Sequence, residues 1–302
     1  KLLAQSPKPS KGIEVLEKSG WLKHFPELDD LRGVPQSRKF HPEGTAYTHT
    51  LQVMDSMAAD PKFRGLSIKE RHKRMLTALG HDFGKVTHTQ IDGEPITKKI
   101  INGIKSGQHN LPEGAKITSH GHDKSGVKPM DSFLKKIMPA GQAAKWSTAI
   151  APYIENHMRR LDLQRDGISL KAASKLSKKV NLNELEMLWR ADVGANLPEG
   201  TIGKKMTPQL QSAFDDFAKM VTEAGIENQP PKRLVQGRDL INLGVKPGPE
   251  MGKALDILEE AQFNQKFKTT VEGIEYFKKN KDNIIKQSIR LGRFGRGRAE
   301  GQ

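Results

Sequence analysis

Several segments of this chain place a histidine or an aspartate on an otherwise apolar helical face. Within residues 143–161, Ile150, Ile154 and His157 stand at relative positions 0, 4 and 7, a spacing that puts them on one side of a single helix. Leu161 continues that side at position 11. Such segments recur along the chain, so the sequence predicts an all-α core with polar side chains pointing into it.

Two further segments show the same feature. His49 lies one turn before Val53 in an apolar stripe from Thr45 to Ala59, and Asp192 shares a face with Leu185. A buried aspartate costs free energy unless it is paired or binds a metal. A hydrogen-bonded core histidine is the more common explanation for any single histidine, and an ion pair with Arg190 or a neighbouring helix is an equal alternative for Asp192.

A compact motif, Gly80-His81-Asp82-Phe83-Gly84-Lys85, follows a helix that the sequence predicts over residues 67–80. Ser67 and Glu70 form a capping box at the start of that helix. Adjacent imidazole and carboxylate groups suit a divalent metal that prefers mixed nitrogen and oxygen ligands. The dipeptide alone is weak evidence, but His49, His122, His157 and Asp192 could belong to the same site.

The composition narrows the chemistry and the compartment. The 302 residues include no cysteine, which excludes disulfides, zinc–thiolate sites and a thiol nucleophile and fits a reducing, cytoplasmic setting. No apolar run is long enough to cross a membrane. The formal net charge of +15 is spread evenly and favours a phosphate-bearing partner, with a basic but non-binding surface as the alternative.

Residues 86–119 differ from the helical remainder. Residues 86–91 alternate, Asp92-Gly93 is a turn signal, and residues 116–118 could form a returning strand. We expect a small β-hairpin that carries a polar, mobile insertion over residues 96–114.

The order of these residues and the local motifs resemble the HD phosphohydrolase superfamily, and in particular the HD domain and tail of bacterial CCA-adding tRNA nucleotidyltransferases. The resemblance covers roughly residues 12–280. The motifs that carry it are Phe25-Pro26-Glu27-Leu28, Gly33-Val34-Pro35-Gln36, His41-Pro42-Glu43-Gly44, Thr48-His49-Thr50-Leu51, Gly80 to Lys85, Gly121-His122-Asp123-Lys124-Ser125, Asn156-His157-Met158, Arg190-Ala191-Asp192, Gly237-Arg238-Asp239-Leu240-Ile241 and Lys246 to Gly252.

The resemblance implies a set of ligands and catalytic residues. His49, His81, Asp82 and Asp192 would hold one divalent ion, while His122 and His157 would complete a second, partly occupied position with Asp82 as a bridge. Lys85 would hold the phosphate, with Arg159 and Arg160 as further phosphate-binding candidates. A donor set without sulfur suits manganese, iron, cobalt, nickel or magnesium better than structural zinc. His122 is the least secure ligand, because Gly126 and Pro129 interrupt the helix expected after it.

The resemblance also implies a domain order. We expect a helical N-terminal lead over residues 1–40, the HD domain over 41–197, a linker and helix over 198–231, an RNA-binding-like helical tail over 232–280 and a basic, disordered Arg-Gly segment over 281–302. Within the tail, short helices near 237–243 and 249–263 would present Arg238, Lys246 and Lys253 to RNA. The end contains Arg290, Arg293, Arg296 and Arg298, which suits salt-dependent RNA contact.

The chain departs from the CCA-adding enzymes in the insertion at 96–114, in Gly126 and Pro129 after His122, and above all in its catalytic head: it shows no Gly-rich turn with paired aspartates for nucleotide transfer. The first hypothesis is therefore a metal-dependent phosphohydrolase, acting as a 2′,3′-cyclic phosphodiesterase or phosphatase on RNA or nucleotide phosphates, such as a tRNA 3′ end. The alternatives are a non-catalytic RNA-binding module, or one piece of a longer or split nucleotidyltransferase that works with a separate head.

Overall fold

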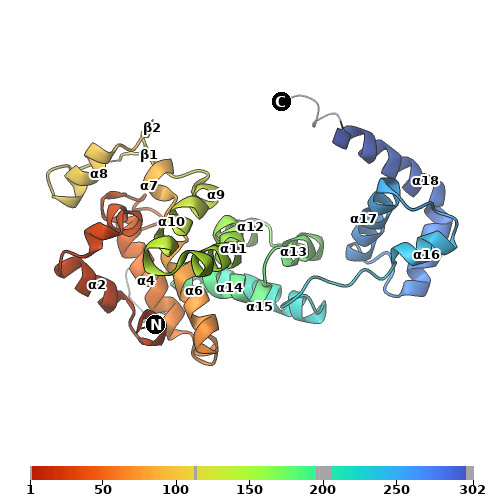
Figure 1. Ribbon diagram of the computed structural model, residues 1–302, viewed down its shortest axis with the longest axis horizontal. Coiled ribbons are helices and arrows are strands. Elements are labelled where there is room, and N and C mark those ends of the chain that lie inside the picture. The colour runs from red at the N-terminus through yellow and green to blue at the C-terminus, as the bar shows by residue number, and fades with distance from the viewer. Residues whose placement is uncertain (1, 112–113, 195–196, 198–205, 297–302) are drawn as a thin grey trace. The chain divides into compact units, whose positions relative to one another are not determined.

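The computed structural model describes residues 2–111, 114–194, 197 and 206–296, and these group into two compact units (Figure 1). Unit 1 comprises residues 1–167 and 180–218. Unit 2 comprises residues 168–179 and 219–302. Both units are built from helices, so the mostly helical fold with a small β insertion is confirmed.

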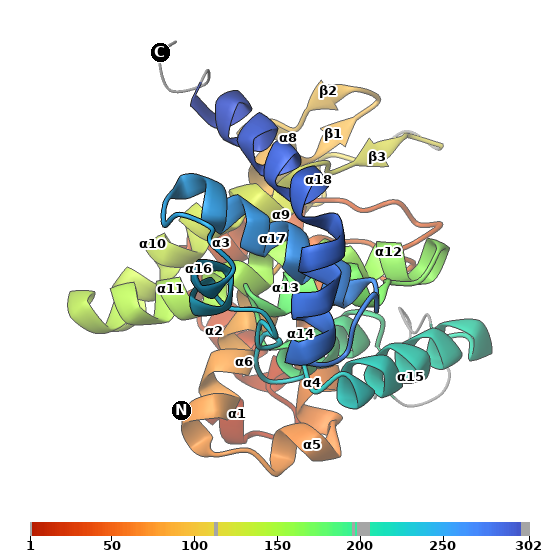
Figure 2. The same ribbon diagram turned by 90° about the vertical axis from the view of Figure 1, so that its right-hand side faces the viewer.

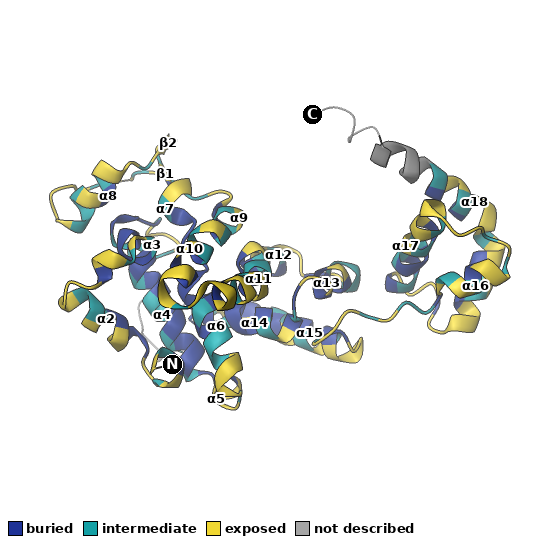
Figure 3. Cartoon of the chain, viewed as in Figure 1, coloured by how far each residue is buried: buried dark blue, intermediate teal, exposed yellow. Residues whose placement is uncertain are grey.

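Four helices form the centre of unit 1: α4 (Ala46–Ala59), α6 (Ile68–Gly80), α11 (Ala140–Asn156) and α14 (Leu182–Asp192). Helices α4, α11 and α14 all pack against α6. The inner faces carry fully buried apolar side chains such as Met54, Leu79 and Ile154, and they appear dark blue in Figure 3. The expected capping box at Ser67 and Glu70 starts α6. The 3.6-residue periodicity therefore located the core helices correctly.

Shorter elements surround this centre. They are α1 (Leu2–Gln5), α2 (Ser10–Lys18), η1 (Leu22–His24), α3 (Pro26–Asp29), η2 (Asp30–Gly33), α5 (Pro61–Arg64), α7 (Lys85–His88), α9 (His122–Ser125), α10 (Val127–Ile137), η3 (His157–Arg159), α12 (Arg160–Arg165) and the part of α15 (Pro208–Glu223) up to residue 218.

The segment expected as a hairpin with a mobile insertion is a small sheet with a docked helix. Strands β1 (Gln90–Ile91), β2 (Glu94–Pro95) and β3 (Ile117–Thr118) pair antiparallel in the order β2-β1-β3 (Figure 2). Between β2 and β3, residues Lys98–Lys105 form α8, which packs on η2.

Helix α8 is held in place by both apolar and charged contacts. Ile101 is buried, and Gly33 lies so close to α8 that a Cβ there would be 2.1 Å from the Ile101 carbonyl oxygen. Lys98 pairs with Asp30. The prediction of a mobile insertion is therefore wrong for α8. Its apolar side packs against the N-terminal lead at Gly33, and Lys98 pairs with Asp30 of the same lead.

The helix expected over residues 143–161 is interrupted. Helix α11 ends at Asn156, and the chain tightens into the 3₁₀ turn η3 before α12 begins. A 3₁₀ turn has about 3.0 residues per turn, so residues beyond it no longer continue the face of α11. Leu161, expected on the buried face, is 38% exposed.

Unit 2 is a small helical unit with its own core. It contains α13 (Leu170–Ser177), α16 (Gly237–Asn242), α17 (Pro249–Phe263) and α18 (Thr270–Arg296). Leu240, Leu258 and Phe277 belong to its buried cluster. Helices α16 and α17 match the two short helices expected there.

The prediction that residues 281–302 are disordered is wrong for 281–296, which continue α18. Ile284 on this stretch is buried in the core of unit 2, and Ile285 packs against that core. Residues 297–302 lie outside the described residues. Among the helices that the structure describes, none is long and apolar enough to span a membrane.

Candidate metal centre

Three possible ligands from three different helices meet in the first trio, His49, His81 and Asp192. Thr45 caps α4, which fixes His49 in the first turn of that helix. Its Nε2 lies 2.9 Å from Asp192 Oδ1, at the last residue of α14. His81 directly follows α6, and its Nε2 lies 4.0 Å from the same oxygen. All three side chains are buried.

The second trio consists of Asp82, His122 and His157. Asp82 Oδ1 lies 3.2 Å from His122 Nε2 and 3.7 Å from His157 Nε2. The two histidine Nε2 atoms are 3.1 Å apart. His122 begins α9 and His157 begins η3, so the ends of two short elements deliver these ligands.

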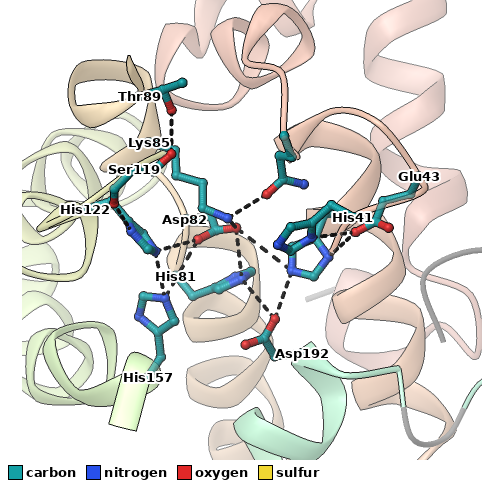
Figure 4. A network of polar contacts seen from close by, with 12 residues as sticks. His41, Glu43, His81, Asp82, Lys85, Thr89, Ser119, His122, His157 and Asp192 are labelled. Carbon is teal, nitrogen blue, oxygen red and sulfur yellow. Dashed lines mark hydrogen bonds and ion pairs between the residues drawn. The ribbon is translucent and has the colours of Figure 1, made fainter. Parts of the chain in front are cut away.

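Asp82 connects the two trios. Its second oxygen, Oδ2, lies 3.4 Å from His81 Nε2 and 3.9 Å from His49 Nε2. Figure 4 shows His81 and Asp82 between the His122–His157 pair on one side and Asp192 on the other. All six residues expected as metal ligands therefore converge on one buried cluster.

The histidine ring orientations are fixed by hydrogen bonds at Nδ1. His81, His122 and His157 each use Nδ1 toward the backbone carbonyl of the residue three positions earlier, at 2.8, 2.6 and 2.6 Å. A carbonyl only accepts hydrogen bonds, so Nδ1 carries a proton in each ring, and whenever such a ring is neutral its Nε2 presents a lone pair. This is the arrangement in which outer partners orient metal-binding histidines.

The second trio is incomplete without a cation. With both Nδ1 atoms protonated, the facing Nε2 atoms of His122 and His157 repel unless a proton or a cation lies between them. Burial, together with neighbouring His122 and His81, lowers the pKa of His157 to about 3, so His157 is neutral. His81 Nε2 is also buried and makes no hydrogen bond. The donor set of nitrogen and oxygen atoms fits a divalent ion at this position.

The carboxylates are ionised despite their burial. Burial opposes the charge of Asp82, but His81 and Lys85 outweigh it and hold the pKa of this carboxyl well below its usual value. Burial likewise opposes the charge of Asp192. Arg160 and His49 outweigh this effect and hold the pKa of Asp192 well below its usual value. Both groups are therefore available as anionic ligands.

Two residues that support the first trio were not among the predicted site residues in those roles. Glu43 Oε1 accepts from His49 Nδ1 at 2.8 Å and from His41 Nδ1 at 2.9 Å. Arg160, expected to bind phosphate, instead forms an ion pair with Asp192 Oδ2 through its Nε. The ion pair considered for Asp192 thus exists, but its partner is not Arg190, which binds Glu186. The His41-Pro42-Glu43-Gly44 motif was the one available signal for Glu43.

Lys85 lies beside the metal ligands, as expected. Its Nζ is 2.7 Å from Asp82 Oδ2 and donates to Gln36 Oε1 at 2.6 Å. Lys85 is buried, and a carboxylate and an amide oxygen take the place of water around its Nζ.

Two glycines explain how His122 reaches the cluster. A Cβ on Gly84 would lie 2.0 Å from the His122 carbonyl oxygen, and a Cβ on Gly126 would lie 3.1 Å from the same atom. The chain after Asp82 therefore packs directly on α9. Pro129 falls in the first turn of α10, where its missing N–H costs no helical hydrogen bond. The irregular sequence around His122 is what lets this ligand approach.

The remaining predicted phosphate or RNA contacts lie on exposed surfaces. Arg159 is paired with Asp162 at 2.7 Å, with 47% of its side chain exposed. In unit 2, Arg238 belongs to α16, Lys246 follows that helix and Lys253 belongs to α17; all three are exposed.

Comparisons with known proteins identify similar sequences over part of the chain. No protein-family model and no solved structure matches it. The Multifunctional CCA protein of Halorhodospira halophila is 45% identical over 80 residues, 26% of this chain and 17% of that protein. That of Neisseria gonorrhoeae is 34% identical over 138 residues, 45% of this chain and 26% of that protein. That of Cupriavidus metallidurans is 28% identical over 145 residues, 48% of this chain and 28% of that protein.

The matched region spans 17–28% of the length of these relatives. Part of this chain is therefore similar in sequence to part of the Multifunctional CCA proteins.

Proposed function

We propose that this chain is a metal-dependent phosphohydrolase of the HD type that acts on RNA or nucleotide phosphates. The observation that carries the proposal is the buried cluster of four histidines and two aspartates. In it, the Nε2 atoms of His122 and His157 face each other 3.1 Å apart. A divalent ion bound beside this pair would remove the repulsion between two lone pairs, as a shared proton also would.

In this proposal the first trio would hold one ion and the second trio another, with Asp82 beside both. Manganese, nickel, cobalt, iron or magnesium suits these nitrogen and oxygen donors. When bound, a divalent ion lowers the pKa of a water and offsets negative charge on a phosphoryl oxygen.

Lys85 positions the substrate. An ammonium has three donors; one donates to Gln36 Oε1, and Nζ also forms an ion pair with Asp82 Oδ2 at 2.7 Å. A further donor would bind a phosphoryl oxygen. Because Lys85 also fixes Asp82 Oδ2, it orients the shared carboxylate while it binds the phosphate.

The chain's similarity to Multifunctional CCA proteins supports RNA, in particular the 3′ end of tRNA, as the source of that phosphate. The net charge of +15 and the exposed Arg238, Lys246 and Lys253 support the same partner. Binding through such residues should weaken steeply as salt rises.

The test combines elemental analysis with a substrate panel. Purified protein with added manganese or nickel should hydrolyse 2′,3′-cyclic nucleotides or phosphomonoesters, and His81→Ala should abolish both hydrolysis and metal retention. Circular dichroism should remain helical in that variant. No turnover of any phosphate substrate by metal-loaded protein would overturn the proposal.

A second candidate is a non-catalytic RNA-binding module, or one piece of a split nucleotidyltransferase. The small share of each relative that this chain matches supports it. In that case wild-type protein and His81→Ala bind RNA equally and neither shows turnover. Mass spectrometry of the native product would reveal any attached head domain, and co-purification would reveal a separate one.

A further inference from the structure

A cavity of about 610 Å³ lies between the loop before α4 and the insertion that carries α8. Its volume is within the usual range for small-ligand sites. One wall comes from residues 35–39 and 44–45, and the other from residues within 104–117. Neither the predicted site residues nor the metal cluster includes any of these positions.

Backbone contacts fix the first wall. Pro35 and Thr45 form an antiparallel bridge, and the Gln36 N–H donates to the Gly44 carbonyl at 2.8 Å. Gly44 has φ +95°, which favours glycine at this turn. This pairing sets the position of Gln36 relative to Thr45, the cap of the helix that carries His49.

The docking of α8 fixes the part of the second wall that Ile104 supplies, and the other lining residues of this wall follow the helix. Ile101 packs directly against Gly33, and the ion pairs of Lys98 with Asp30 and of Lys105 with Asp29 anchor both ends of the helix. Ile104 therefore belongs to the same packed assembly as the first wall.

The described lining has the chemistry of a nucleotide site. Arg38 and Lys39 are exposed cations, and no lining residue that the structure describes carries a carboxylate. Ile104, Leu111 and Ile117 supply partly buried apolar surface. Cations beside apolar surface suit a ligand that combines a phosphate with a flat ring.

Gln36 links this cavity to the metal centre. The residue is 5% exposed, its Oε1 accepts from Lys85, and its Nε2 is buried without a hydrogen-bond partner. Lysine only donates, so the oxygen must face Lys85 and the unpartnered amide donor must point elsewhere. Lys85 in turn contacts Asp82 (Figure 4). A buried donor without a partner costs free energy unless a ligand satisfies it.

We propose that this cavity is the nucleoside subsite of the phosphohydrolase, an inference that rests on the function proposed above. The base of a ribonucleotide packs on Ile104, Leu111 and Ile117. Gln36 lies at the cavity wall and connects the cavity to Lys85. Arg38 and Lys39 neutralise a neighbouring phosphate, which a free mononucleotide lacks and an RNA 3′ end provides.

Three substrates and two variants test the subsite in the full chain with manganese. The substrates are p-nitrophenyl phosphate, a 2′,3′-cyclic mononucleotide and a short oligoribonucleotide that ends in a 2′,3′-cyclic phosphate. Leu111→Glu places a carboxylate in the cavity and should raise KM for both nucleotide substrates about tenfold or more, with p-nitrophenyl phosphate hydrolysis unchanged. Ile137→Glu, at a 42% exposed position on α10, is the matched control and should change none of the three.

Removal of the Arg38 and Lys39 cations distinguishes the two sources of the ribonucleotide, an RNA end and a free mononucleotide. Arg38→Ala together with Lys39→Ala should weaken only the oligoribonucleotide if an RNA end is the ligand, and neither substrate if a mononucleotide is. Unchanged nucleotide KM values in Leu111→Glu, or an equal loss on all three substrates, would overturn the subsite.

Calorimetric titration of the mononucleotide into chelator-treated protein separates this inference from the proposed function. Binding to wild type but not to Leu111→Glu, with no hydrolysis by any form, would retain the subsite and reject the phosphohydrolase. Hydrolysis of p-nitrophenyl phosphate without any nucleotide binding would retain the phosphohydrolase and reject the subsite.

Discussion

The two trios of the metal centre share Asp82 as a neighbour but differ in how the protein balances their charge. In the first trio, Asp192 has Arg160 as a cationic partner, and His49 lies between Asp192 and Glu43. In the second trio, the Nε2 atoms of His122 and His157 face each other at 3.1 Å. Burial lowers the pKa of His49, but Asp192 and Glu43 outweigh it and raise that pKa, so a proton can stabilise the first trio without metal. Burial lowers the pKa of His157 to about 3, so we expect the second trio to depend more on a bound ion.

The largest effect is expected from Asp82→Asn, which removes the charge that both trios share. An amide keeps the shape but is a poor ligand, so hydrolysis should fall more than about 100-fold, beyond the loss seen for outer-shell changes, and elemental analysis should show less metal per chain. Asp123→Asn is the control, because Asp123 follows His122 as Asp82 follows His81 but belongs to neither trio. Full metal content in Asp82→Asn would show that the trios bind independently of this residue.

Arg160→Ala should destabilise the metal-free protein by about 3–5 kcal/mol, because it leaves the buried Asp192 carboxylate without its main cation. A divalent ion in the first trio would replace part of that charge, so added metal should restore much of the unfolding midpoint. Urea denaturation with and without metal measures both effects.

Arg159→Ala provides the comparison for that variant, since the neighbouring Arg159 side chain is 47% exposed and its loss should stay within about 0.5 kcal/mol. Equal destabilisation by the two arginine variants would contradict the role of Arg160 in the first trio.

Gly84→Ala acts on the second trio through packing. Its new methyl group would meet the His122 carbonyl oxygen at 2.0 Å, so α7 and α9 must separate at a cost of about 1–3 kcal/mol. Metal retention should fall with it, since His122 moves with α9. Gly141→Ala in α11 meets nothing within 4 Å and should be neutral or slightly stabilising in the same thermal unfolding assay.

The smallest effect should come from Glu43→Gln. A glutamine oxygen can still accept from His49 Nδ1 but carries no charge, so metal affinity should fall about tenfold, the lower end for an outer-shell partner. Competition with a fluorescent chelator measures the change. A drop as large as that of Asp82→Asn would mean that Glu43 binds the ion itself.

Helical periodicity was enough to predict the core and to mark the unusual residues in it. His49 and Asp192 could be picked out because a polar side chain on an apolar stripe breaks a regular pattern. His81 and Asp82 could be found because they end a helix with a recognisable cap. Grouping these residues into one site came from the resemblance to HD proteins rather than from spacing.

The supporting residues escaped prediction for physical reasons. Arg160 follows a 3₁₀ turn, whereas the sequence predicted a uniform helix there. The direction of the Arg160 side chain could therefore not be predicted. Glu43 lies in a loop whose shape depends on a long-range pairing with residues 34–36. Helix α8 and the extension of α18 are rich in basic residues and glycine, a composition that predicts an exposed segment. Contacts with residues distant in the sequence hold the apolar sides of both segments in place.

The 3₁₀ turn η3 carries His157 at its start, and Arg160 follows at the next residue after its end. Residues three apart are eclipsed in a 3₁₀ turn, whereas an α-helix would rotate them about 60° apart. One tightened turn thus supplies a ligand to the second trio and the counter-ion of the first. A substitution that let this turn relax into α11 would move a candidate ligand of the second trio and the counter-ion of the first trio together, although it replaced neither residue.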